Sequence, residues 1–349
     1  MSILAIGTIS GTSLDGMDIA LCRFSETQKG WKYDIEEATT ITYPESWVTS
    51  LRNASSLNAH EFLMLHNKYG LYTGELIHKF ISETGKLPLL IASHGHTIFH
   101  DPNEKLTFQL GNGASIAAST RLTTVSDFRI LNVALGGQGA PLVPAGDQLL
   151  FADYEYCLNL GGFANISFEV GGIRQAYDIC PVNVLLNTLA QQKGFSFDKN
   201  GMIGASGNIN KSLLLKLNSL DYYHANWPKS IGREWVEKEI NPLVTSFPLS
   251  VEDLAATVYE HISEQISYAM PRPGSVLITG GGAKNTFLMQ RISSKTNCQL
   301  VIPDEQLVDY KEALIFALLG ILALTGRENV YGSATGSDQN HIGGTIFRI

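Results

Sequence analysis

The sequence has little of several features that mark particular classes of protein. It holds only four cysteines in 349 residues, and Cys22, Cys157, Cys180 and Cys298 lie too far apart for a metal motif or a disulfide framework. Free thiols of this kind are typical of a reducing compartment, so we expect a cytoplasmic protein. No basic segment precedes the first apolar residues, and we therefore expect no signal peptide.

Charge and long apolar runs are also limited. Charged residues make up 17% of the chain, the net charge is −8, and no block of consecutive Lys or Arg occurs. This pattern argues against partners that are bound through positive charge, so we expect neither nucleic acid nor a membrane surface as a partner. The longest apolar run, residues 313–324, is too short to span a bilayer and predicts a buried helix.

Two common nucleotide-binding motifs are absent. No Gly-x-x-x-x-Gly-Lys-Ser/Thr occurs, which argues against a P-loop, and no Gly-x-Gly-x-x-Gly follows the first strand, which weakens a dinucleotide site. The hydrophobic content of 44% is that of a globular protein. Because 349 residues exceed what one core usually supports, we expect two domains.

What the sequence does have is glycine-rich turns between apolar runs. The first lies within residues 3–24, where two short apolar runs flank a turn of small residues. Glycines let successive backbone N–H groups converge, and hydroxyls add further donors, so such a turn suits a phosphate. An ordinary β-hairpin turn is the alternative. The turn contains Gly11, Thr12, Ser13 and Gly16, with Asp15 and Asp18 on its exit side.

Two further stretches favour the phosphate interpretation. Residues 156–168 repeat the order of strand, glycine turn and strand, and residues 276–285 form a strand that runs into three glycines before a helix. Three glycine turns on separate strands indicate the walls of one nucleotide site. The hairpins at 3–24 and 156–168 also predict an internal architectural repeat, with one hairpin opening each domain.

Periodicity and turn residues predict an α/β fold in which strands alternate with helices. In the first half, the expected helices are 58–83 and 114–120, and the expected strands are 3–6, 17–24, 34–43, 87–92, 106–110 and 123–126. In the second half, the expected helices are 182–192, 206–217, 250–270 and 312–324, and the expected strands are the 156–168 hairpin, 172–178, one from 276, 299–302 and 344–349.

Several local signals refine this prediction. Pro181 suits the first position of a helix, Ser250 and Asp253 suit a capping box, and residues 197–201 form a polar turn. Residues 127–144 lack periodicity, so we place the crossover between domains there. The expected domains are 1–127 with 331–349, and 128–330.

Seven blocks, in this order, resemble the signature blocks of the anhydro-N-acetylmuramic acid kinases and cover nearly the whole chain. They are Ser10-Gly-Thr-Ser-Leu-Asp-Gly-Met-Asp18, Ser93-His-Gly-His-Thr97, Asp127-Phe-Arg129, Leu135-Gly-Gly-Gln-Gly-Ala-Pro-Leu-Val-Pro144, Leu158-Asn-Leu-Gly-Gly-Phe-Ala-Asn165, Pro228-Lys-Ser-Ile-Gly-Arg-Glu234 and Gly280-Gly-Gly-Ala-Lys-Asn285.

The resemblance implies a fold and an activity. That family belongs to the actin, sugar kinase and heat-shock ATPase superfamily, with two ribonuclease-H-like domains flanking an interdomain nucleotide cleft. It implies a kinase that uses ATP and Mg²⁺, hydrolyses a 1,6-anhydro bond of a small sugar and phosphorylates its O6 in cell-wall recycling. Family members are often dimers, so a homodimer is possible.

The matching blocks imply an ATP site contributed by all three glycine turns. The expected ATP-binding residues are Gly11, Thr12, Ser13, Leu14, Asp15, Gly16, Met17, Asp18, Gly161, Gly162, Asn165, Gly280, Gly281, Gly282 and Asn285.

Asp178 is the expected catalytic base. It lies where a strand ends before a helix, and the positive end of that helix would keep the carboxylate ionised, as a base must be. The resemblance implies that it activates water for attack on the anomeric carbon; a carboxylate that merely caps the helix is the alternative. The family usually has Asp-Thr-Gly-Pro-Gly-Asn, and here Ile179, Cys180 and Val182 replace the Thr and both Gly residues. We expect these larger side chains to reshape the sugar pocket.

Four other residues match sugar-side positions of the family: His94, Asp127, Arg129 and Glu312. A guanidinium suits the lactyl carboxylate of a muramic acid, and a surface salt bridge is the alternative for Asp127 and Arg129. A helix-terminal acid is the alternative for Glu312. His94, His96 and His100 could also suggest a metal site, but a third ligand and a carboxylate at suitable positions are not evident, and structural histidines are favoured.

Two other functions remain open at this point. One is a diverged member that acts on another anhydro sugar or binds sugar and nucleotide without turnover. The other is a metal-dependent hydrolase built on His94 and His96.

Overall fold

A computed structural model describes residues 2–11, 14–227 and 229–349. The chain divides into two compact units. Unit 1 comprises the chain up to Leu150 together with Tyr310–Ile349, and unit 2 comprises Phe151–Asp309. None of the helices formed by the described residues is long and apolar enough to cross a membrane.

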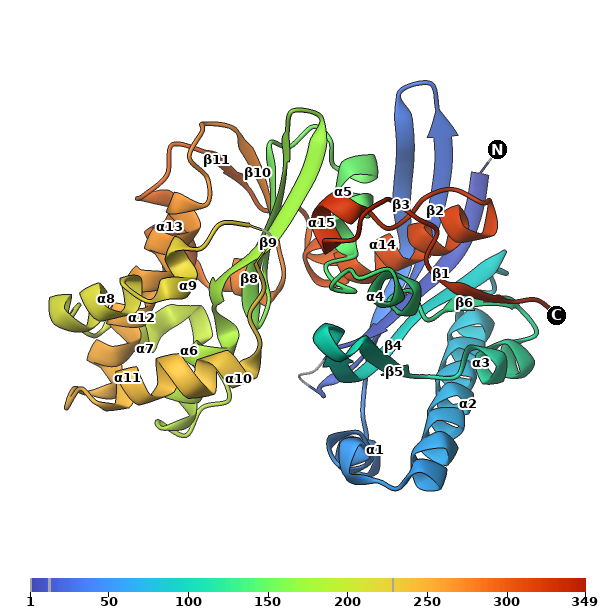
Figure 1. Cartoon of the computed structure of the whole chain (residues 1–349), viewed down its shortest axis with the longest axis horizontal. Helices are drawn as coiled ribbons and strands as arrows, with labels where there is room; N and C mark the ends of the chain where they lie inside the picture. The colour runs from blue at the N-terminus through green and yellow to red at the C-terminus, as the bar shows by residue number, and fades with distance from the viewer. Residues whose placement is uncertain (1, 12–13, 228) are drawn as a thin grey trace. The chain divides into compact units, whose positions relative to one another are not determined.

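Unit 1 is built on a mixed seven-stranded sheet in the order β12-β6-β4-β1-β2-β3, with β5 paired to β4 (Figure 1). The first three strands are antiparallel neighbours, while β4 is parallel to β1 and β6 is parallel to β4. Its strands are β1 (Ser2–Ser10), β2 (Gly16–Thr27), β3 (Gly30–Thr42), β4 (Leu90–Asp101), β5 (Leu106–Leu110), β6 (Thr123–Ser126) and β12 (Thr345–Phe347).

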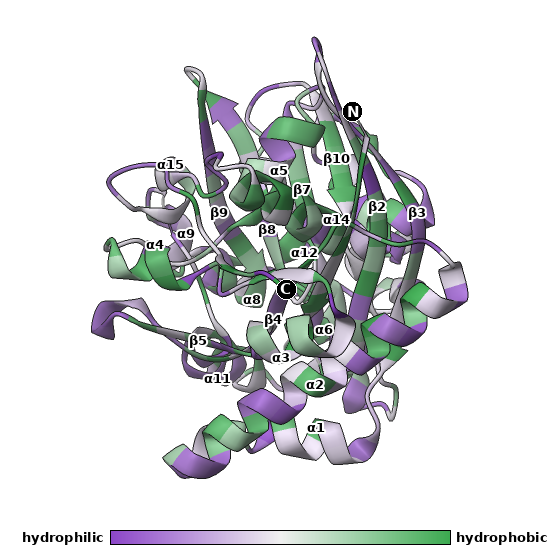
Figure 2. Cartoon of the chain, turned by 90° about the vertical axis from the view of Figure 1, so that its right-hand side faces the viewer, coloured by the Kyte–Doolittle hydropathy of each residue, from purple (hydrophilic) through white to green (hydrophobic). Residues whose placement is uncertain are grey.

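Helices cover both faces of this sheet. On one face, Leu65 and Ile77 of α2 and Ile116 of α3 share a buried hydrophobic cluster with Ile6 and Ile91 of the sheet. The bands along α2 in Figure 2 show its alternation of hydrophobic and hydrophilic residues. The helices are α1 (Glu45–Arg52), α2 (Ala59–Thr84), α3 (Gly113–Thr120), α4 (Ile130–Ala134), α5 (Val143–Leu150), α15 (Gly332–Thr335) and the part of α14 (Glu305–Leu324) from Tyr310 onward.

The other face of the sheet is packed against α14 at unusually close range. A Cβ on Gly7 of β1 would lie 1.8 Å from the backbone oxygen of Ala313, and one on Gly320 would lie 2.6 Å from Cβ of Ala92 on β4. Only glycine therefore permits this approach of helix and sheet.

Unit 2 is built on a five-stranded sheet in the order β11-β10-β7-β8-β9. Its strands are β7 (Tyr156–Leu160), β8 (Phe163–Val170), β9 (Ile173–Pro181), β10 (Ser275–Thr279) and β11 (Gln299–Val301). Its main helices are α6 (Asn183–Gln191), α7 (Met202–Ala205), α8 (Lys211–Asn218), α9 (Asp221–His224), α10 (Arg233–Trp235), α11 (Asn241–Thr245), α12 (Val251–Tyr268) and α13 (Thr286–Ser293), with the π-helical turn η4 (Val236–Ile240) and the 3₁₀ turn η5 (Gly281–Lys284).

The two sheets repeat one topology. In each unit three consecutive strands pair antiparallel, and two later strands extend the sheet in parallel from the first strand. These later strands are β4 and β6 in unit 1 and β10 and β11 in unit 2. The predicted repeat is therefore present, and so is the predicted α/β fold of two ribonuclease-H-like domains. The C-terminal strand β12 pairs with β6, so the chain returns to unit 1 as expected.

Several local predictions differ from the structure. The strand expected over 87–92 continues to Asp101, and residues 206–217 form the shorter helix α8 after α7. Pro181 ends β9 rather than opening α6. Ser250 does cap α12 by accepting a hydrogen bond from Asp253 N, whereas the Asp253 carboxylate accepts one from Asn208 N.

The predicted domain boundaries also differ from the compact units. Residues 128–150 and 310–330 were expected in the second domain, but both segments belong to unit 1. Tertiary contacts are the reason. The side chain of Asn132 donates to Thr335 and Ser337 at 2.8 and 3.1 Å, and buried Lys311 forms an ion pair with Asp147 at 2.7 Å.

We expect the free energy of unfolding to fall as the pH drops below about 6.5. His261 on α12 is fully buried, and burial lowers its pKa to about 3. Between these pH values the unfolded chain binds a proton that the folded chain does not bind. This single histidine therefore lowers the free energy of unfolding by up to about 1.4 kcal/mol per pH unit.

Urea unfolding at pH 7, 6 and 5 measures this effect. His96, whose pKa is lowered to about 4 by burial, should contribute with the same sign. His261→Gln removes one titrating group, so its stability should depend less steeply on pH than that of the wild type. Equal slopes for the two proteins would contradict the role given to His261.

Candidate functional site

The first glycine turn joins β1 to β2 in unit 1. The backbone N–H of Leu14 donates to Gly11 O at 3.4 Å, and Leu14 has a positive φ of 60°. Thr12 and Ser13, also expected to bind ATP, lie outside the described residues. Asp15 is exposed beyond the turn, whereas Gly16 and Met17 are buried at the start of β2. The side chain of Met17 lies in the hydrophobic core of unit 1, so only its backbone is placed to meet a ligand.

A hydrogen-bonded network supports the end of β1, directly before this turn. The Ser10 hydroxyl lies 2.9 Å from Nδ1 of His96 and accepts a hydrogen bond from the Tyr43 hydroxyl at 2.7 Å, and Tyr43 in turn contacts Tyr69. All four side chains are buried. The prediction for this turn did not include Ser10 or Tyr43, which come from separate parts of the chain.

His94 and Arg129 form a second cluster in unit 1. Nε of Arg129 donates to Nε2 of His94 at 2.9 Å, and a further guanidinium nitrogen donates to Gly139 O at 3.0 Å. Nδ1 of His94 lies 3.0 Å from Gly95 O, so it carries the proton of a neutral ring. Burial lowers the pKa of His94 well below its usual value, which agrees with that tautomer.

Glu312 and Asp18 bring negative charge to the same unit. Burial raises the pKa of the Glu312 carboxyl, the charge of Lys311 opposes the shift, and that of Asp18 adds to it. The Asp18 carboxylate accepts a hydrogen bond from the Thr40 hydroxyl at 2.6 Å. Burial lowers the pKa of Arg129 to about 10, and Glu312 opposes this shift, so the two opposite charges act on each other.

Asp127 is placed differently from Arg129. It has a positive φ of 59°, and its carboxylate accepts a hydrogen bond from the Ser126 hydroxyl at 2.8 Å. Arg129 forms no ion pair with any residue that the structure describes, so the surface salt bridge considered from the sequence is not seen. Within the described chain, no group of three or more His, Cys, Asp or Glu side chains could hold a metal ion.

The second glycine turn joins β7 to β8 in unit 2, beside the start of α6. Gly162 O accepts hydrogen bonds from the backbone N–H groups of Val182 and Val184 at 2.9 and 3.2 Å. A Cβ on Gly161 would meet only ordinary contacts, the nearest being Asn159 Nδ2 at 3.4 Å. Asn165 on β8 lies opposite Asp178 on β9 in the strand register.

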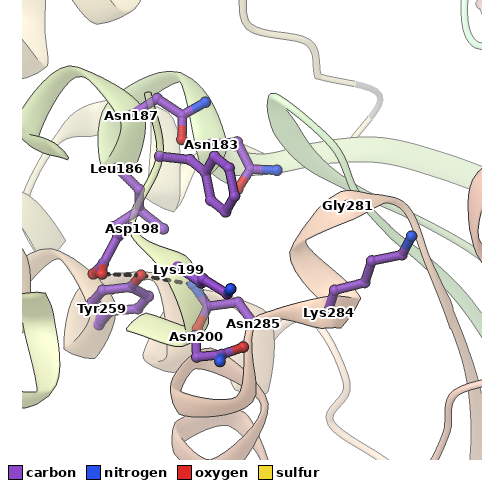
Figure 3. A pocket seen from close by; sticks show the side chains of 11 residues that line it. Asn183, Leu186, Asn187, Asp198, Lys199, Asn200, Tyr259, Gly281, Lys284 and Asn285 are labelled. Carbon is purple, nitrogen blue, oxygen red and sulfur yellow. Dashed lines mark hydrogen bonds between the residues drawn. The ribbon is translucent and has the colours of Figure 1, made fainter. Parts of the chain in front are cut away.

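The third glycine turn borders a pocket of about 240 Å³ in unit 2 (Figure 3). Four amide side chains, one exposed aromatic ring and two lysines contribute to its wall. Its lining residues are Asn183, Leu186, Asn187, Phe197, Asp198, Lys199, Asn200, Tyr259, Gly281, Lys284 and Asn285.

A chain of hydrogen bonds holds the floor of this pocket. The Tyr259 hydroxyl donates to the Asp198 carboxylate at 3.1 Å and accepts from the Asn285 amide at 2.7 Å (Figure 3). Oδ1 of Asn285 also caps α13 by accepting from Leu288 N. Gly280 adopts a φ of 83°, and a Cβ on it or on Gly282 would lie 2.9 Å or less from Leu160 or Asn159.

The structure thus brings together part of the predicted site and adds residues that sequence reasoning missed. Gly281 and Asn285 line the pocket as members of the expected ATP set, whereas Asn183, Asp198 and Tyr259 were not predicted to bind. The polar turn at 197–201 was the one available signal. Its partners Tyr259 and Asn285 are far away in the sequence, so only folding reveals the pocket.

Asp178 is held by a loop of unit 2. Its Oδ2 accepts hydrogen bonds from the Ser230 hydroxyl at 2.7 Å and from Ile231 N at 3.1 Å. Its backbone N–H donates to Lys229 O at 3.2 Å, and its carbonyl accepts from the Tyr222 hydroxyl at 2.5 Å. No described residue donates to Oδ1.

This environment corrects the one expected for Asp178. The residue lies inside β9, which continues to Pro181, and not at a strand end beside a helix terminus. Burial raises the pKa of its carboxyl, while the hydrogen bonds from Ser230 and Ile231 lower it. Hydrogen bonds from the loop, not a helix dipole, therefore favour its ionised form.

The three residues that replace the usual family motif pack inward. Ile179, Cys180 and Val182 are 3%, 0% and 0% exposed and belong to the hydrophobic core of unit 2. We expected them to reshape a sugar pocket, but their side chains instead fill the core under β9. Val182 has a φ of −120°, so this position does not need the positive φ that glycine adopts readily.

Comparisons with known proteins cover the whole chain. Residues 3–349 match the family described as Anhydro-N-acetylmuramic acid kinase. The anhydro-N-acetylmuramic acid kinase of Pseudomonas syringae pv. tomato (strain ATCC BAA-871 / DC3000) is 34% identical over 376 residues, covering 99% of this chain and 100% of the relative. The enzyme of that name from Pseudomonas fluorescens (strain Pf0-1) is 32% identical over 373 residues, covering 99% of each chain.

Solved structures show more distant likenesses. The activator of the 2-hydroxyisocaproyl-CoA dehydratase from Clostridium difficile with bound ADPNP is 13% identical, with a TM-score of 0.45 over 90% of this chain and 93% of that chain. A ROK family glucokinase from Streptomyces griseus in complex with glucose and AMPPNP is 11% identical, with a TM-score of 0.41 over 90% and 98%.

Proposed function

Because the chain belongs to the anhydro-N-acetylmuramic acid kinase family, we propose that it hydrolyses the 1,6-anhydro bond of anhydro-N-acetylmuramic acid and phosphorylates O6 with ATP. The observation that carries this proposal is the carboxylate of Asp178, which is held through Oδ2 while no described residue donates to Oδ1. A carboxylate fixed in this way can accept a proton from a water molecule. This sugar comes from the bacterial cell wall, so the reaction would serve its recycling in the cytoplasm.

The proposed reaction has two linked steps, hydrolysis of the anhydro bond and transfer of the γ-phosphoryl group to O6. Asp178 takes a proton from water, the water oxygen bonds to the anomeric carbon, and the bond from that carbon to O6 breaks. O6 then forms a bond to the γ-phosphorus of ATP as the bond to ADP breaks. Positioning and electrostatic stabilisation account for most of the catalysis of such a phosphoryl transfer.

We propose that the base and the ribose of the nucleotide bind in the pocket of unit 2. The pocket beside Gly281 and Asn285 offers an exposed ring, Phe197, and amide side chains that can donate to or accept from a base and a ribose. Lys199 adds positive charge at this pocket, whereas Lys284 is already paired with Glu305 and Asp309 at 3.1 and 2.7 Å. The turns at Gly11 and at Gly161–Gly162 are the proposed phosphate contacts.

Mg²⁺ is the proposed partner of the ATP phosphates. This ion usually binds through one or two carboxylates together with phosphates and water. Asp18 and Glu312 are the carboxylates proposed for this role. The negative charge of Asp18 raises the pKa of the Glu312 carboxyl, and a bound cation would oppose this effect by stabilising both carboxylates in their ionised form. The bound ion would neutralise charge on the transferred phosphoryl group.

The remaining residues of unit 1 are proposed to bind the sugar. The guanidinium of Arg129, held by His94 and Gly139 O, suits the lactyl carboxylate. Both ring nitrogens of His94 are engaged, so its contact with the sugar stays a prediction, as does that of Asp127. Because Ile179, Cys180 and Val182 lie in the core, we do not favour binding without turnover.

An isotope experiment tests the proposed function. The protein is incubated with ATP, Mg²⁺ and anhydro-N-acetylmuramic acid in ¹⁸O-labelled water, and the product is examined by mass spectrometry. We expect a sugar 6-phosphate with one ¹⁸O at the anomeric carbon and none in the phosphate. A phosphorylated sugar without solvent oxygen, or no sugar phosphate at all, would contradict the proposal.

Gly281→Leu should weaken ATP binding by about tenfold or more without unfolding the protein. A Cβ on Gly281 meets nothing closer than Asn183 Nδ2 at 4.0 Å, so a larger side chain has room to extend into the pocket. It would occupy volume that the nucleotide needs, and a tenfold loss corresponds to about 1.4 kcal/mol. Isothermal titration with ATP and a melting curve measure both effects.

Gly281→Ala is the matched control for this change. A methyl group leaves most of the pocket open, so ATP affinity should stay close to that of the wild type. If Gly281→Leu binds ATP as well as Gly281→Ala does, the nucleotide does not use this pocket.

A further inference from the structure

Three consecutive residues, 229–231, lie far from Asp178 in the sequence but form hydrogen bonds with it in the fold. Lys229 O accepts from the backbone N–H of Asp178, while the Ser230 hydroxyl and the backbone N–H of Ile231 both donate to Oδ2. The segment Lys229–Ile231 thus contacts both the backbone and the carboxylate of one residue. We call this segment the clasp.

The clasp is itself held in place by neighbouring side chains. Nζ of Lys229 donates to Tyr222 O at 2.9 Å and lies over the rings of Tyr222 and Tyr177 at 4.7 and 5.5 Å. The hydroxyl of Tyr222 donates a hydrogen bond to the carbonyl oxygen of Asp178. Ile231 is 9% exposed, so one end of the clasp is anchored in the unit.

Of the two groups that donate to Oδ2 of Asp178, only the one from Ser230 can be removed by mutation. The Ile231 donor is a backbone N–H and is present whatever residue stands there. The Ser230 donor is a side-chain hydroxyl on an exposed residue, so it can be deleted without disturbing a core. Because Ser230 is exposed, its side chain packs into no core. Its hydrogen bond to Asp178 is therefore the contact through which it can act.

We propose that Ser230 is a positioning residue that orients the carboxylate of Asp178, holding Oδ2 so that Oδ1 is presented to the attacking water. This inference rests on the proposed function, in which Asp178 is the base. Ser230 touches neither water nor sugar in this role; it acts through the carboxylate. Its hydroxyl also favours the charged form of the base, because a donated hydrogen bond stabilises a carboxylate more than a carboxylic acid.

The charged and titratable groups around Asp178 are few. From β9 these are Tyr177 and Cys180, from α9 Tyr222, and from the clasp Lys229. Burial raises the pKa of the Asp178 carboxyl, and the Ser230 and Ile231 donors are the groups that lower it. Removing the Ser230 donor should therefore raise that pKa further.

The pH dependence of kcat tests the proposal. In the wild type, kcat falls on the acid side as Asp178 becomes protonated. In Ser230→Ala this fall should begin at a pH about 0.5–1 unit higher, because one of the donors to the carboxylate is gone. On the acid side of the profile, kcat of Ser230→Ala would be about three- to tenfold lower than that of the wild type. The difference in kcat would be smaller at high pH.

Two further variants complete the series. Ser230→Thr keeps the hydroxyl and should retain the wild-type profile, and Ser230→Cys offers a weak donor and should fall between wild type and Ser230→Ala. Melting temperatures of all variants report on folding separately from the rate. A Ser230→Ala protein with the wild-type rate at high pH and an unmoved acid limb would overturn the positioning role.

Asp178→Asn separates this inference from the proposed function. If Asp178→Asn is inactive and Ser230→Ala keeps both the wild-type rate and the wild-type acid limb, the positioning role alone is wrong. If Asp178→Asn retains the wild-type rate, the assignment of the base itself is wrong, and with it the role of Ser230.

Discussion

Asp178→Asn is expected to lower the rate of sugar phosphorylation by about 10²- to 10⁴-fold, the usual cost of losing general base catalysis. An amide has the shape of the carboxylate, and its oxygen can still accept the hydrogen bonds from Ser230 and Ile231. It cannot take a proton from water at neutral pH. ATP binding should remain close to that of the wild type, because Asp178 does not line the pocket beside Gly281.

Turnover and melting temperature measured on the same preparation test this expectation. A purely structural Asp178 would instead lower the free energy of unfolding by roughly 0.5–1.5 kcal/mol, the usual net contribution of a hydrogen bond, and leave the rate per folded molecule unchanged. Asp221→Asn, an exposed change from Asp to Asn at the start of α9 in the same unit, is the matched control and should keep full activity. Full activity of Asp178→Asn would exclude it as the base.

Gly7→Ala should lower the free energy of unfolding by about 3 kcal/mol or more, an effect at the upper end for overpacked sites. The added Cβ would lie 1.8 Å from the oxygen of Ala313 and 2.7 Å from the nitrogen of Ala317. Both are backbone atoms of α14, which cannot rotate away as a side chain can. The helix would have to move off β1, which would open the buried packing between them.

Urea unfolding of the full-length protein measures this loss. Gly161→Ala serves as the control, because its Cβ would meet Asn159 Nδ2 at an ordinary 3.4 Å. Its stability should stay within about 1 kcal/mol of the wild type. A Gly7→Ala protein with the wild-type unfolding midpoint would show that α14 adjusts to the added methyl group at little cost.

Secondary structure was the most predictable part of this protein. The strands at Leu106–Leu110 and Thr123–Ser126 were predicted with their observed bounds, and so was Ser250 as the residue that caps α12. These features depend on neighbouring residues, through alternation of apolar side chains, turn residues and capping hydroxyls. The repeated hairpins around glycine turns likewise predicted that both units share one topology.

Local signals were misleading where a distant contact decides the structure. Residues 127–144 lack periodicity, so the crossover between domains was placed there. Asn132 in this segment donates hydrogen bonds to Thr335 and Ser337, more than 200 residues away, and belongs with them to unit 1. Val182 replaces a glycine of the usual motif and was expected to narrow a pocket. Its side chain lies in the core instead, because the direction of a side chain depends on the strand or helix that carries it.

The sequence by itself determined the order of the elements, the repeat, the family and the residues whose chemistry suits a kinase. Only the tertiary structure decided which of these residues meet. Asp178 is separated from Ser230 by 52 residues, and the pocket beside Gly281 combines α6, the turn at Phe197, α12, η5 and the residue that caps α13. Patterns along the chain report nearest neighbours, whereas a site is made of side chains that approach each other only when the sheet and its helices pack.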